Sequence, residues 1–483
     1  MTGELIWQII DIVFFINIAL AIVVVLFERK NPTVTVTWLL MLLFMPVIGF
    51  VLYVFLGQDL RKKQLFYLKK DEECELYPIL HQQHDCLHMH NLPFVNPRLH
   101  DYEDILQLNL SNSQSLLTQN NEVKVFNEGQ ELFAEIIDAL KKAQTYIHME
   151  YYIIRNDTLG KEIIQILAQK AHEGVEVKLL YDGMGGVRLP KKFFRPLIEA
   201  GGKVTSFFPP FIPYINLRIN YRNHRKICLI DGKEGFVGGF NIGDEYRGLS
   251  KRFGHWRDMH VKIQGSALDG LEVRFLLDWR YASKENVTSD KQYFPERTSA
   301  GTKAVQIVSS GPDSKWPAIK DGYVKLICGA KSNLYIQTPY FIPDGSISEA
   351  LRLAALSGVD VRIVIPAKRD HMFVHWASLS FAGELLEAGV RFYLYKEGFL
   401  HSKMIVCDGF ASTVGTSNLD LRSFNLNFEV NAFIYDEAIA SDLEQRFLMD
   451  LNDSEEITME RYNARPILIR TKEAFSRLLS PIL

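Results

Sequence analysis

Two copies of one short motif constrain this chain more strongly than any other feature. Each copy reads His-x-Lys-x4-Asp, and the six residues concerned are His224, Lys226, Asp231, His401, Lys403 and Asp408. An Asn follows each His at the same spacing, at the end of a turn of small residues, and these are Asn241 and Asn418. This repetition predicts one active site that is assembled from two half-sites.

The sequence around the two motifs repeats as well, in the same order of helices and strands. Helix, strand, helix and buried strand follow one another at 131–142, 146–153, 161–172 and 174–180, and again at 318–330, 335–342, 346–356 and 358–364. Such alternation predicts an α/β fold. We expect two tandem domains, at 126–300 and 301–483, related by a pseudo-twofold axis, each a mixed sheet flanked by helices.

The motif residues suit chemistry at a phosphorus atom. Residues two apart on a strand point to the same face, so each His shares a face with its Lys. A neutral imidazole is a nucleophile, a second His can move protons, and a Lys ammonium attracts phosphate oxygens. The amides of Asn241 and Asn418 are predicted to bind the phosphate as well. With two lysines in place, we predict neither a metal nor another cofactor.

Acidic residues are candidates for the support of this site. A His in acid–base chemistry needs an acceptor on its other ring nitrogen. Glu429 and Asp258 each precede a strand-like run, and we expect them to orient His401 and His224 respectively, with a plain surface charge as the alternative. The motif residues Asp231 and Asp408 each precede a Gly, which is typical of a tight turn, so we interpret them as structural.

The first sixty residues contain two long apolar runs, 5–27 and 33–56, separated by a short charged loop. Each run is long enough to cross ~30 Å of hydrocarbon, which predicts a transmembrane hairpin at 1–57. The Lys and Arg residues near the ends of the runs favour a cytoplasmic location for both termini and for the large C-terminal part. A pair of buried helices in a soluble protein is the alternative.

Residues 58–125 are polar and are predicted to form an irregular linker, in which 102–110 forms a short helix that begins the soluble body. Its histidines, His81, His84, His88 and His90, do not match a zinc-binding pattern, so a His-rich surface segment is favoured over a metal site. The five cysteines are scattered without a CxxC pair, which favours free thiols and a reducing compartment. A net charge of −3 argues against a protein that binds nucleic acid regardless of sequence.

The doubled motif is the signature of the phospholipase D superfamily, and the chain resembles that superfamily in both copies. Its resemblance to the bacterial cardiolipin synthases extends over essentially the whole chain and is carried by residues 337–344, 414–424, 427–431 and 477–481. One departure is Gly239, where the superfamily usually has Ser and the second half of this chain has Thr416. The missing hydroxyl is expected to loosen one phosphate contact.

The resemblance implies a specific reaction, in which two phosphatidylglycerol molecules give cardiolipin and glycerol through a phosphatidyl-histidine. It also implies that His224 is the nucleophile, that His401 is the acid and base, and that the enzyme works at the cell membrane on anionic lipids. Two segments are predicted to face the bilayer. One is 187–196, which combines aromatic and basic residues, and the other is the apolar loop 207–215, which is followed by Arg218, Arg222 and Arg225.

Four other functions fit parts of the sequence. A phospholipase that uses water as the acceptor would have the same site, as would a phosphatidyltransferase that acts on another phospholipid. A nuclease of the same fold is disfavoured by the apolar N-terminus and the near-neutral charge. A non-catalytic membrane adaptor is disfavoured because His and Lys are present in both motifs.

Overall fold

The structure is a computed structural model that describes residues 8, 12, 14–16, 18–19, 32–45, 49, 53, 65–66, 70–209, 220–285, 287, 291–296 and 299–480. It divides into two units. The first comprises Met1–Lys62 and Pro209–Tyr221, and the second comprises Lys63–Phe208 and Arg222–Leu483.

The first unit contains helix α2 (Pro32–Phe44). Leu42 on this helix and Tyr53 are buried, and the ring of Trp38 stands edge-on to Tyr53 with 5.3 Å between ring centroids. Among the residues that the structure describes, no helix has the length and apolar character needed to cross a membrane. Most of the two runs predicted to form a transmembrane hairpin lies outside the described residues.

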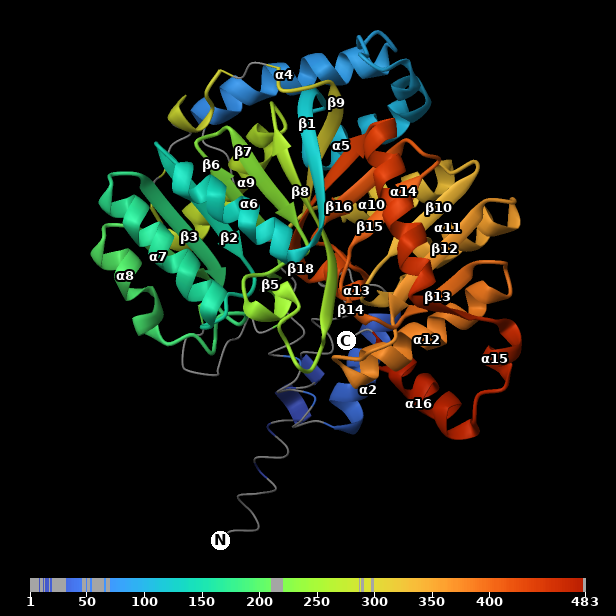
Figure 1. Cartoon of the computed structure of the whole chain (residues 1–483). Coiled ribbons are helices and arrows are strands. Elements are labelled where there is room, and N and C mark those ends of the chain that lie inside the picture. The colour runs from blue at the N-terminus through green and yellow to red at the C-terminus, as the bar shows by residue number, and fades with distance from the viewer. Residues whose placement is uncertain are drawn as a thin grey trace. The chain divides into compact units, whose positions relative to one another are not determined.

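The second unit is built on β-strands that fall into two matching sets (Figure 1). The first set is β1 (Thr118–Glu128), β2 (Tyr146–Tyr151), β3 (Glu176–Asp182), β4 (Lys203–Phe207), β5 (Arg222–Asn223), β6 (Lys226–Ile230), β7 (Glu234–Gly238) and β8 (His255–Gln264). The second set is β9 (Lys303–Ser310), β10 (Asn333–Gln337), β11 (Phe341–Ile342), β12 (Asp360–Pro366), β13 (Arg391–Tyr395), β14 (Gly398–Leu400), β15 (Met404–Cys407), β16 (Ala411–Gly415), β17 (Leu419–Asp420), β18 (Asn427–Tyr435) and β19 (Ser454–Ile457).

The two sets pair in the same order. The first half reads β4-β3-β2-β6-β7-β8-β1, and the second reads β13-β12-β10-β15-β16-β18-β9, with β19 added beside β13. In each half the first three strands are parallel and the others antiparallel. Strands β1 and β9 pair antiparallel, which joins the two halves. This arrangement confirms the predicted mixed α/β fold.

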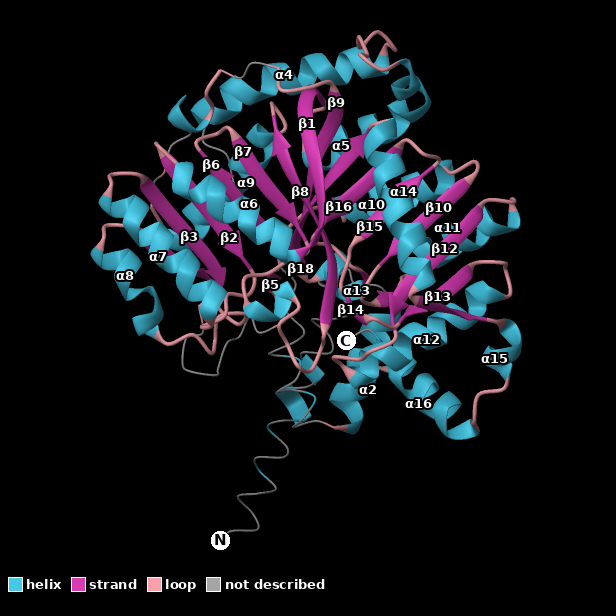
Figure 2. Ribbon diagram, in the orientation of Figure 1, coloured by secondary structure: helices cyan, strands magenta, loops and turns pink. Residues whose placement is uncertain are grey.

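Helices flank the strands of both halves (Figure 2). In the first half they are α6 (Gly129–Lys142), α7 (Thr158–His172), α8 (Arg195–Glu199) and α9 (Leu268–Ser283), with the short 3-10 helices η2 (Lys191–Phe194), η3 (Asp244–Arg247) and η4 (Lys291–Tyr293). In the second half they are α10 (Ala318–Gly329), α11 (Gly345–Leu356), α12 (Met372–Leu386), α13 (Leu421–Asn425), α14 (Glu437–Asn452), α15 (Met459–Asn463) and α16 (Ile467–Leu478).

Each half has its own apolar core, and helical periodicity explains how the helices contribute to it. On α6, Leu132, Phe133, Ile136 and Leu140 recur at helical spacing, so they share the face that is buried in the first core. The equivalent helix α10 buries Ile319 and its neighbours in the second core.

The segment 58–125 is more regular than expected, and the short helix predicted at 102–110 is confirmed. The described part of this segment forms α4 (Lys70–His88), the 3-10 helix η1 (Pro97–Tyr102), α5 (Glu103–Ser113) and the start of β1. Leu80, Leu106 and Leu110 are buried in the core of the second half. Polar residues dominate the composition here. The few apolar side chains lie on one side of each helix and pack that helix against the core.

The expectation that 187–196 faces the bilayer is wrong for its aromatic residues. Phe193 and Phe194 are buried in the core of the first half, and the ring of Phe194 stacks on Tyr181 at 4.9 Å. Most of the second such segment, 207–215, lies outside the described residues. The described cysteines, Cys86, Cys228, Cys328 and Cys407, are free thiols, as predicted.

Candidate active site

Each motif histidine is held by the main chain of the opposite half. Strand β5 leads into His224 and runs parallel to β18, while β14 leads into His401 and runs parallel to β8 (Figure 1). The main-chain N–H of His224 donates to the carbonyl oxygen of Phe428 at 2.9 Å. That of His401 donates to the carbonyl oxygen of Arg257 at 2.7 Å. Each half therefore positions the histidine of the other.

The acid beside each histidine also comes from the opposite half. Nδ1 of His224 lies 3.0 Å from a carboxylate oxygen of Glu429, and Nδ1 of His401 lies 2.6 Å from one of Asp258. The sequence led us to expect the reverse, Glu429 with His401 and Asp258 with His224, and that assignment is wrong. Spacing along the chain does not show that β5 lies against β18 and β14 against β8.

The two carboxylates fix which ring nitrogen is free to react. We assign the proton of neutral His224 to Nδ1, because the Glu429 carboxylate and the Thr416 carbonyl oxygen both face that nitrogen as acceptors. At His401 the Asp258 carboxylate favours the same assignment, and the Lys403 ammonium lies 2.7 Å from the same nitrogen. The lone pair is then on Nε2. His224 and His401 are each 8% exposed, which leaves an edge that a substrate can reach, whereas Glu429 and Asp258 are fully buried.

The two lysines are buried beside the histidines. Each ammonium donates to the main-chain oxygen of its own motif histidine, Lys226 to that of His224 and Lys403 to that of His401. Burial lowers the pKa of Lys226 to about 7 and that of Lys403 to about 8, and the charge of Lys403 contributes to the shift of Lys226. Such a pair gains from a bound anion, because the anion would stabilise both charges.

The charged groups of the two motifs also act on one another, which supports the expectation of one site built from both. Burial is the main cause that lowers the pKa of His224, and the charges of both Lys226 and Lys403 add to it. Burial, and then Lys403, lower the pKa of His401 to about 4, and Lys226 again contributes. A charge shifts the pKa of another group appreciably only when the two groups are close together in the protein. Both histidines are therefore neutral in the free site.

The motif aspartates have the structural role that the sequence indicates, and neither is in contact with an imidazole. The Asp231 carboxylate accepts hydrogen bonds from the main-chain N–H groups of Gln144, Thr145 and Tyr146. Asp408 binds the equivalent main-chain N–H groups of residues 331–333 in the second half. Both aspartates have positive φ, 53° and 51°, in the turn that follows the motif strand. They fix the ends of the strands that carry the site.

The amides predicted to bind phosphate have local partners. The side-chain oxygen of Asn241 accepts from the N–H of Ile153 at 3.0 Å. The side-chain nitrogen of Asn418 donates to Asp420 at 3.0 Å, while its buried oxygen has no hydrogen-bond partner in the described structure. Phosphate binding by either amide therefore stays a prediction.

Sequence reasoning assigned Arg225, which occupies the variable position inside the first motif, to a bilayer-facing group of basic residues. That assignment is wrong, because Arg225 is 1% exposed. This buried guanidinium forms an ion pair with Asp278 at 2.7 Å and donates to the main-chain oxygen of Glu429 at 3.2 Å. It thereby ties β18, which carries Glu429, to the segment between β5 and β6 that carries His224. The second motif has Ser402 at this position, so the repeat gave no reason to single out Arg225.

The chain is similar to known proteins over nearly its whole length. The family model described as "Cardiolipin synthase, PLD-like domain" matches residues 136–253 and 323–451, and the model described as "Phospholipase_D-nuclease N-terminal" matches residues 15–58. The chain is 48% identical to the major cardiolipin synthase ClsA of Bacillus subtilis, over 98% of each chain. It is 47% identical to cardiolipin synthase 2 of Staphylococcus epidermidis, over 97% of this chain and 96% of that one.

Among solved structures, phosphatidylserine synthase from Haemophilus influenzae superposes with a TM-score of 0.59 at 16% identity, covering 80% of this chain and all of that one. This likeness concerns the fold alone. The chain matches two cardiolipin synthases at 47% and 48% identity over nearly its full length, and its two motif histidines are each held by the opposite half. The chain belongs to the bacterial cardiolipin synthases, phosphatidyltransferases of the phospholipase D superfamily.

Proposed function

We propose that this enzyme transfers a phosphatidyl group from one phosphatidylglycerol to another, giving cardiolipin and glycerol, through a covalent phosphatidyl-histidine. The observation that carries the proposal is the crosswise pairing of two histidines with two buried carboxylates, beside two buried lysines. One histidine can act as a nucleophile while the other moves protons, and the lysines can hold the phosphodiester between them.

In the first step, Nε2 of His224 attacks the phosphorus of the donor lipid. The N–P bond forms, the bond from phosphorus to the glycerol oxygen breaks, and His401 gives its proton to that oxygen. In the free site burial lowers the pKa of His401 to about 4, so this proton is not held there. The bound phosphodiester brings a negative charge beside the ring, which raises this pKa and favours the protonated form.

In the second step, a headgroup hydroxyl of the acceptor lipid gives its proton to Nε2 of His401. Its oxygen forms the new bond to phosphorus, the N–P bond breaks, and the electron pair returns to His224. Asp258 and Glu429 stabilise the charge that each ring carries in turn, as the buried carboxylate does in a catalytic triad. No metal is needed in this sequence of steps.

The product mixture tests this function directly. Full-length enzyme with phosphatidylglycerol vesicles as the sole lipid should release glycerol and form cardiolipin. Phosphatidic acid with glycerol would instead support a hydrolase. Vesicles of another phospholipid, offered without phosphatidylglycerol, test a different donor, and a product formed only there would contradict the proposal.

We propose further that residues 1–57 form a transmembrane hairpin and that the catalytic body lies on the cytoplasmic side. The two apolar runs and the match of residues 15–58 to the N-terminal family model support this. The exposed thiol of Cys328 offers a test. A membrane-impermeant maleimide should label Cys328 in lysed cells and leave it unlabelled in intact protoplasts. Equal labelling in both would contradict the proposed side.

The lysine pair predicts an unusual pH dependence. Because the pKa values of Lys226 and Lys403 are lowered to about 7 and about 8, both lose their charge at a pH where an ordinary lysine is still protonated. We therefore expect kcat/KM, which reports the free enzyme, to fall as the pH rises above this range. The profile belongs to the coupled pair and not to one lysine. A bound phosphodiester raises both pKa values, so kcat should fall at a higher pH. A flat kcat/KM up to pH 10 would contradict this expectation.

Gly239 makes room for the carboxylate of Asp258. A Cβ atom at Gly239 would lie 1.8 Å from Oδ1 of Asp258, which is an impossible contact. In the second half, the hydroxyl of Thr416 bonds to the main chain of Val430, so the equivalent hydroxyl has a structural role and does not support the expected loosening of phosphate binding at Gly239.

We expect Gly239→Ser to push Asp258 away from His401 and to lower kcat by roughly 10²-fold, as small misplacements in active sites do. Thr416→Ser, which keeps the hydroxyl, is the matched control and should stay near wild-type activity.

A further inference from the structure

A buried carboxyl group on β2 has no role in the proposed reaction steps, although it lies next to the first motif. Glu150 is 1% exposed, and one of its oxygens accepts a hydrogen bond from the side-chain nitrogen of Asn223, the residue before His224. Its other oxygen, Oε2, is buried without a hydrogen-bond partner in the described part of the chain. An ionised carboxylate would be costly in such a place, because a buried charge needs partners on both oxygens.

Asn223 connects Glu150 to the main chain on both sides of His224. The main-chain N–H of Asn223 donates to the carboxylate of Asp182 at 2.8 Å, and its side-chain oxygen accepts from the N–H of Arg225 at 3.2 Å. The side-chain nitrogen is the remaining end of this amide, and Glu150 holds it. The orientation of the amide therefore depends on Glu150, and so does the bend of the chain that carries His224.

The charged neighbours of Glu150 favour its neutral form. The guanidiniums of Arg225 and Arg274 lie 2.7 and 2.8 Å from the carboxylate of Asp278, and Asp313 acts on the same two guanidiniums. No ion pair in the described part of the chain includes Glu150. Burial, and then the charge of Asp278, raise the pKa of Glu150 well above its ordinary value. A proton on Glu150 would turn the repulsion between the two carboxyl groups into a hydrogen bond.

The second half has a neutral side chain at the equivalent position. Glu150 on β2 lies opposite Ile227, which is three residues after His224. Gln337 on β10 lies opposite Met404, which is three residues after His401. The two side chains therefore occupy the same place in the two halves of the repeat.

Gln337 shows the bond that a neutral Glu150 would make. The side-chain nitrogen of Gln337 donates to the carboxylate of Asp450 at 2.7 Å, and Asp450 also pairs with Arg257 at 2.9 Å. Asp450 is on α14, the helix that follows β18, as Asp278 is on α9, the helix that follows β8. A protonated Glu150 would donate to Asp278 just as the amide of Gln337 donates to Asp450.

The link to the motif exists only in the first half of the described structure. The residue before His401 is Leu400, which has no amide to correspond to that of Asn223. In agreement with this, the side-chain oxygen of Gln337 is buried without a hydrogen-bond partner among the described residues. Both halves thus have the bond to the helix carboxylate, and the first half adds a bond to the segment that carries its histidine.

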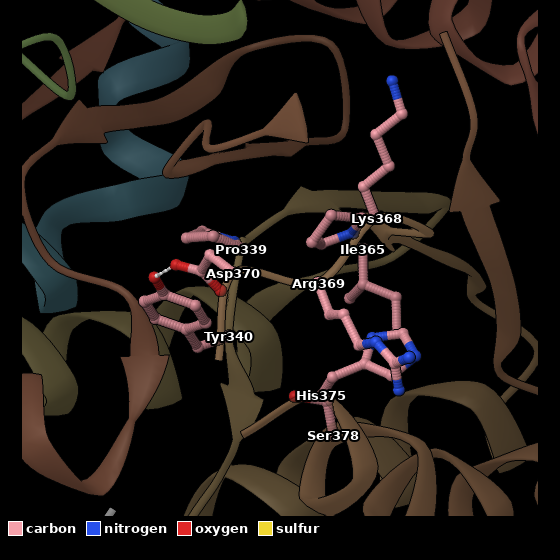
Figure 3. Close-up of a pocket in the computed structure, with 9 residues that line it drawn as sticks. Pro339, Tyr340, Ile365, Lys368, Arg369, Asp370, His375 and Ser378 are labelled. Atoms are coloured by element: carbon pink, nitrogen blue, oxygen red, sulfur yellow. Dashed lines mark hydrogen bonds between the residues drawn. The ribbon is translucent and has the colours of Figure 1, made fainter. Parts of the chain in front are cut away.

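The chain beyond this position also differs between the halves. The ring of Tyr152, two residues after Glu150, lies edge-on to the ring of His224 with 4.9 Å between centroids. In the second half the corresponding residues, Pro339 and Tyr340, line a small pocket (Figure 3), and the ring of Tyr340 is 6.4 Å from that of His401. The end of β2 therefore packs more closely on its histidine than the end of β10 does.

We propose that Glu150 is a positioning residue of the first half-site and that it acts as a neutral carboxylic acid. One oxygen accepts from Asn223 and the carboxyl O–H donates to Asp278. These two bonds hold the segment that presents Nε2 of His224 to phosphorus. The inference rests on the proposed function, in which His224 forms the phosphatidyl-enzyme.

Substitutions at Glu150 separate its shape and neutrality from its charge. Glu150→Gln keeps an acceptor for Asn223 and supplies an N–H donor for Asp278, so the full-length enzyme in phosphatidylglycerol vesicles should keep a kcat close to wild type. Glu150→Met fills a similar space without either bond and should lower kcat by roughly 10²-fold, as small misplacements in active sites do. KM should change little, because Lys226 and Lys403 are untouched.

The second half provides the matched control. Gln337→Met makes the same kind of change at the equivalent position, where no Asn depends on the side chain, so kcat should fall far less for a comparable loss of thermal stability. If Glu150→Met does not fold, Asn223→Leu breaks the same link by placing in the first half the residue type of Leu400. It is expected to lower kcat with little change in KM.

Infrared spectroscopy tests the protonation state without reference to activity. The difference spectrum between wild type and Glu150→Gln at neutral pH should contain the C=O band of a protonated carboxylic acid, present in wild type and missing from the variant. A difference spectrum with carboxylate bands alone would overturn the neutral form.

The kinetic results can also overturn the inference. An unchanged kcat in both Glu150→Met and Asn223→Leu would refute the positioning role, and an equal fall in Glu150→Gln and Glu150→Met would mean that the charge is what matters. Wild-type enzyme that formed no cardiolipin would instead refute the proposed function. The infrared band does not depend on the reaction, so the two failures are distinguishable.

Discussion

Replacing either motif histidine by Ala is expected to lower cardiolipin formation by about 10⁴-fold or more, since a nucleophile or an acid–base group is lost. The two variants should differ in a single turnover with acyl-labelled phosphatidylglycerol. His401→Ala keeps the nucleophile and should slowly accumulate a phosphatidyl-enzyme that is labile in acid and stable in alkali, as a P–N bond is. His224→Ala should acquire no label.

His172→Ala removes a histidine outside the site and should behave as wild type. The opposite labelling pattern, with label in His224→Ala and none in His401→Ala, would exchange the two roles. A double variant without His224 and His401 that still formed cardiolipin would refute the mechanism altogether.

The second large effect is expected from neutralising Glu429 or Asp258, the carboxylates that each contact the motif histidine of the opposite half. Glu429→Gln and Asp258→Asn keep the shape of each side chain but remove the charge that fixes the ring of its histidine. We expect each to lower kcat by about 10²- to 10⁴-fold, the range seen when an orienting carboxylate is lost. Thermal unfolding should accompany the assay, because both groups are fully buried.

Labelling in the His401→Ala background separates the two carboxylates. In that background only His224 reacts, so Glu429→Gln should strongly slow the formation of the phosphatidyl-enzyme. Asp258→Asn should add little, since its partner is already absent. The reverse outcome would support Glu429 as the partner of His401, which is the pairing that the sequence suggested.

Local patterns were sufficient for much of this protein. The alternation of strands and helices, the repeated order and the doubled motif predicted the mixed α/β fold and a single site made of two halves. The Asp-Gly pairs at 231–232 and 408–409 predicted tight turns that end the motif strands, and both aspartates have positive φ there. Such features depend on spacings of two to four residues, where side-chain direction follows from backbone geometry.

Contacts between distant segments were decided only by the tertiary structure. The sequence indicated Glu429 and Asp258 as orienting acids, but it did not show which histidine each one contacts. Spacing along the chain does not reveal which strands of the two halves lie side by side. The burial of Phe193 and Phe194, the packing of the helices before residue 118, and the space that Gly239 leaves for Asp258 are of the same kind. The sequence by itself determined which groups we propose for the chemistry. The tertiary structure decided which of them act together, since the pairing of β5 with β18 and of β14 with β8 brings each histidine to the acid of the other half.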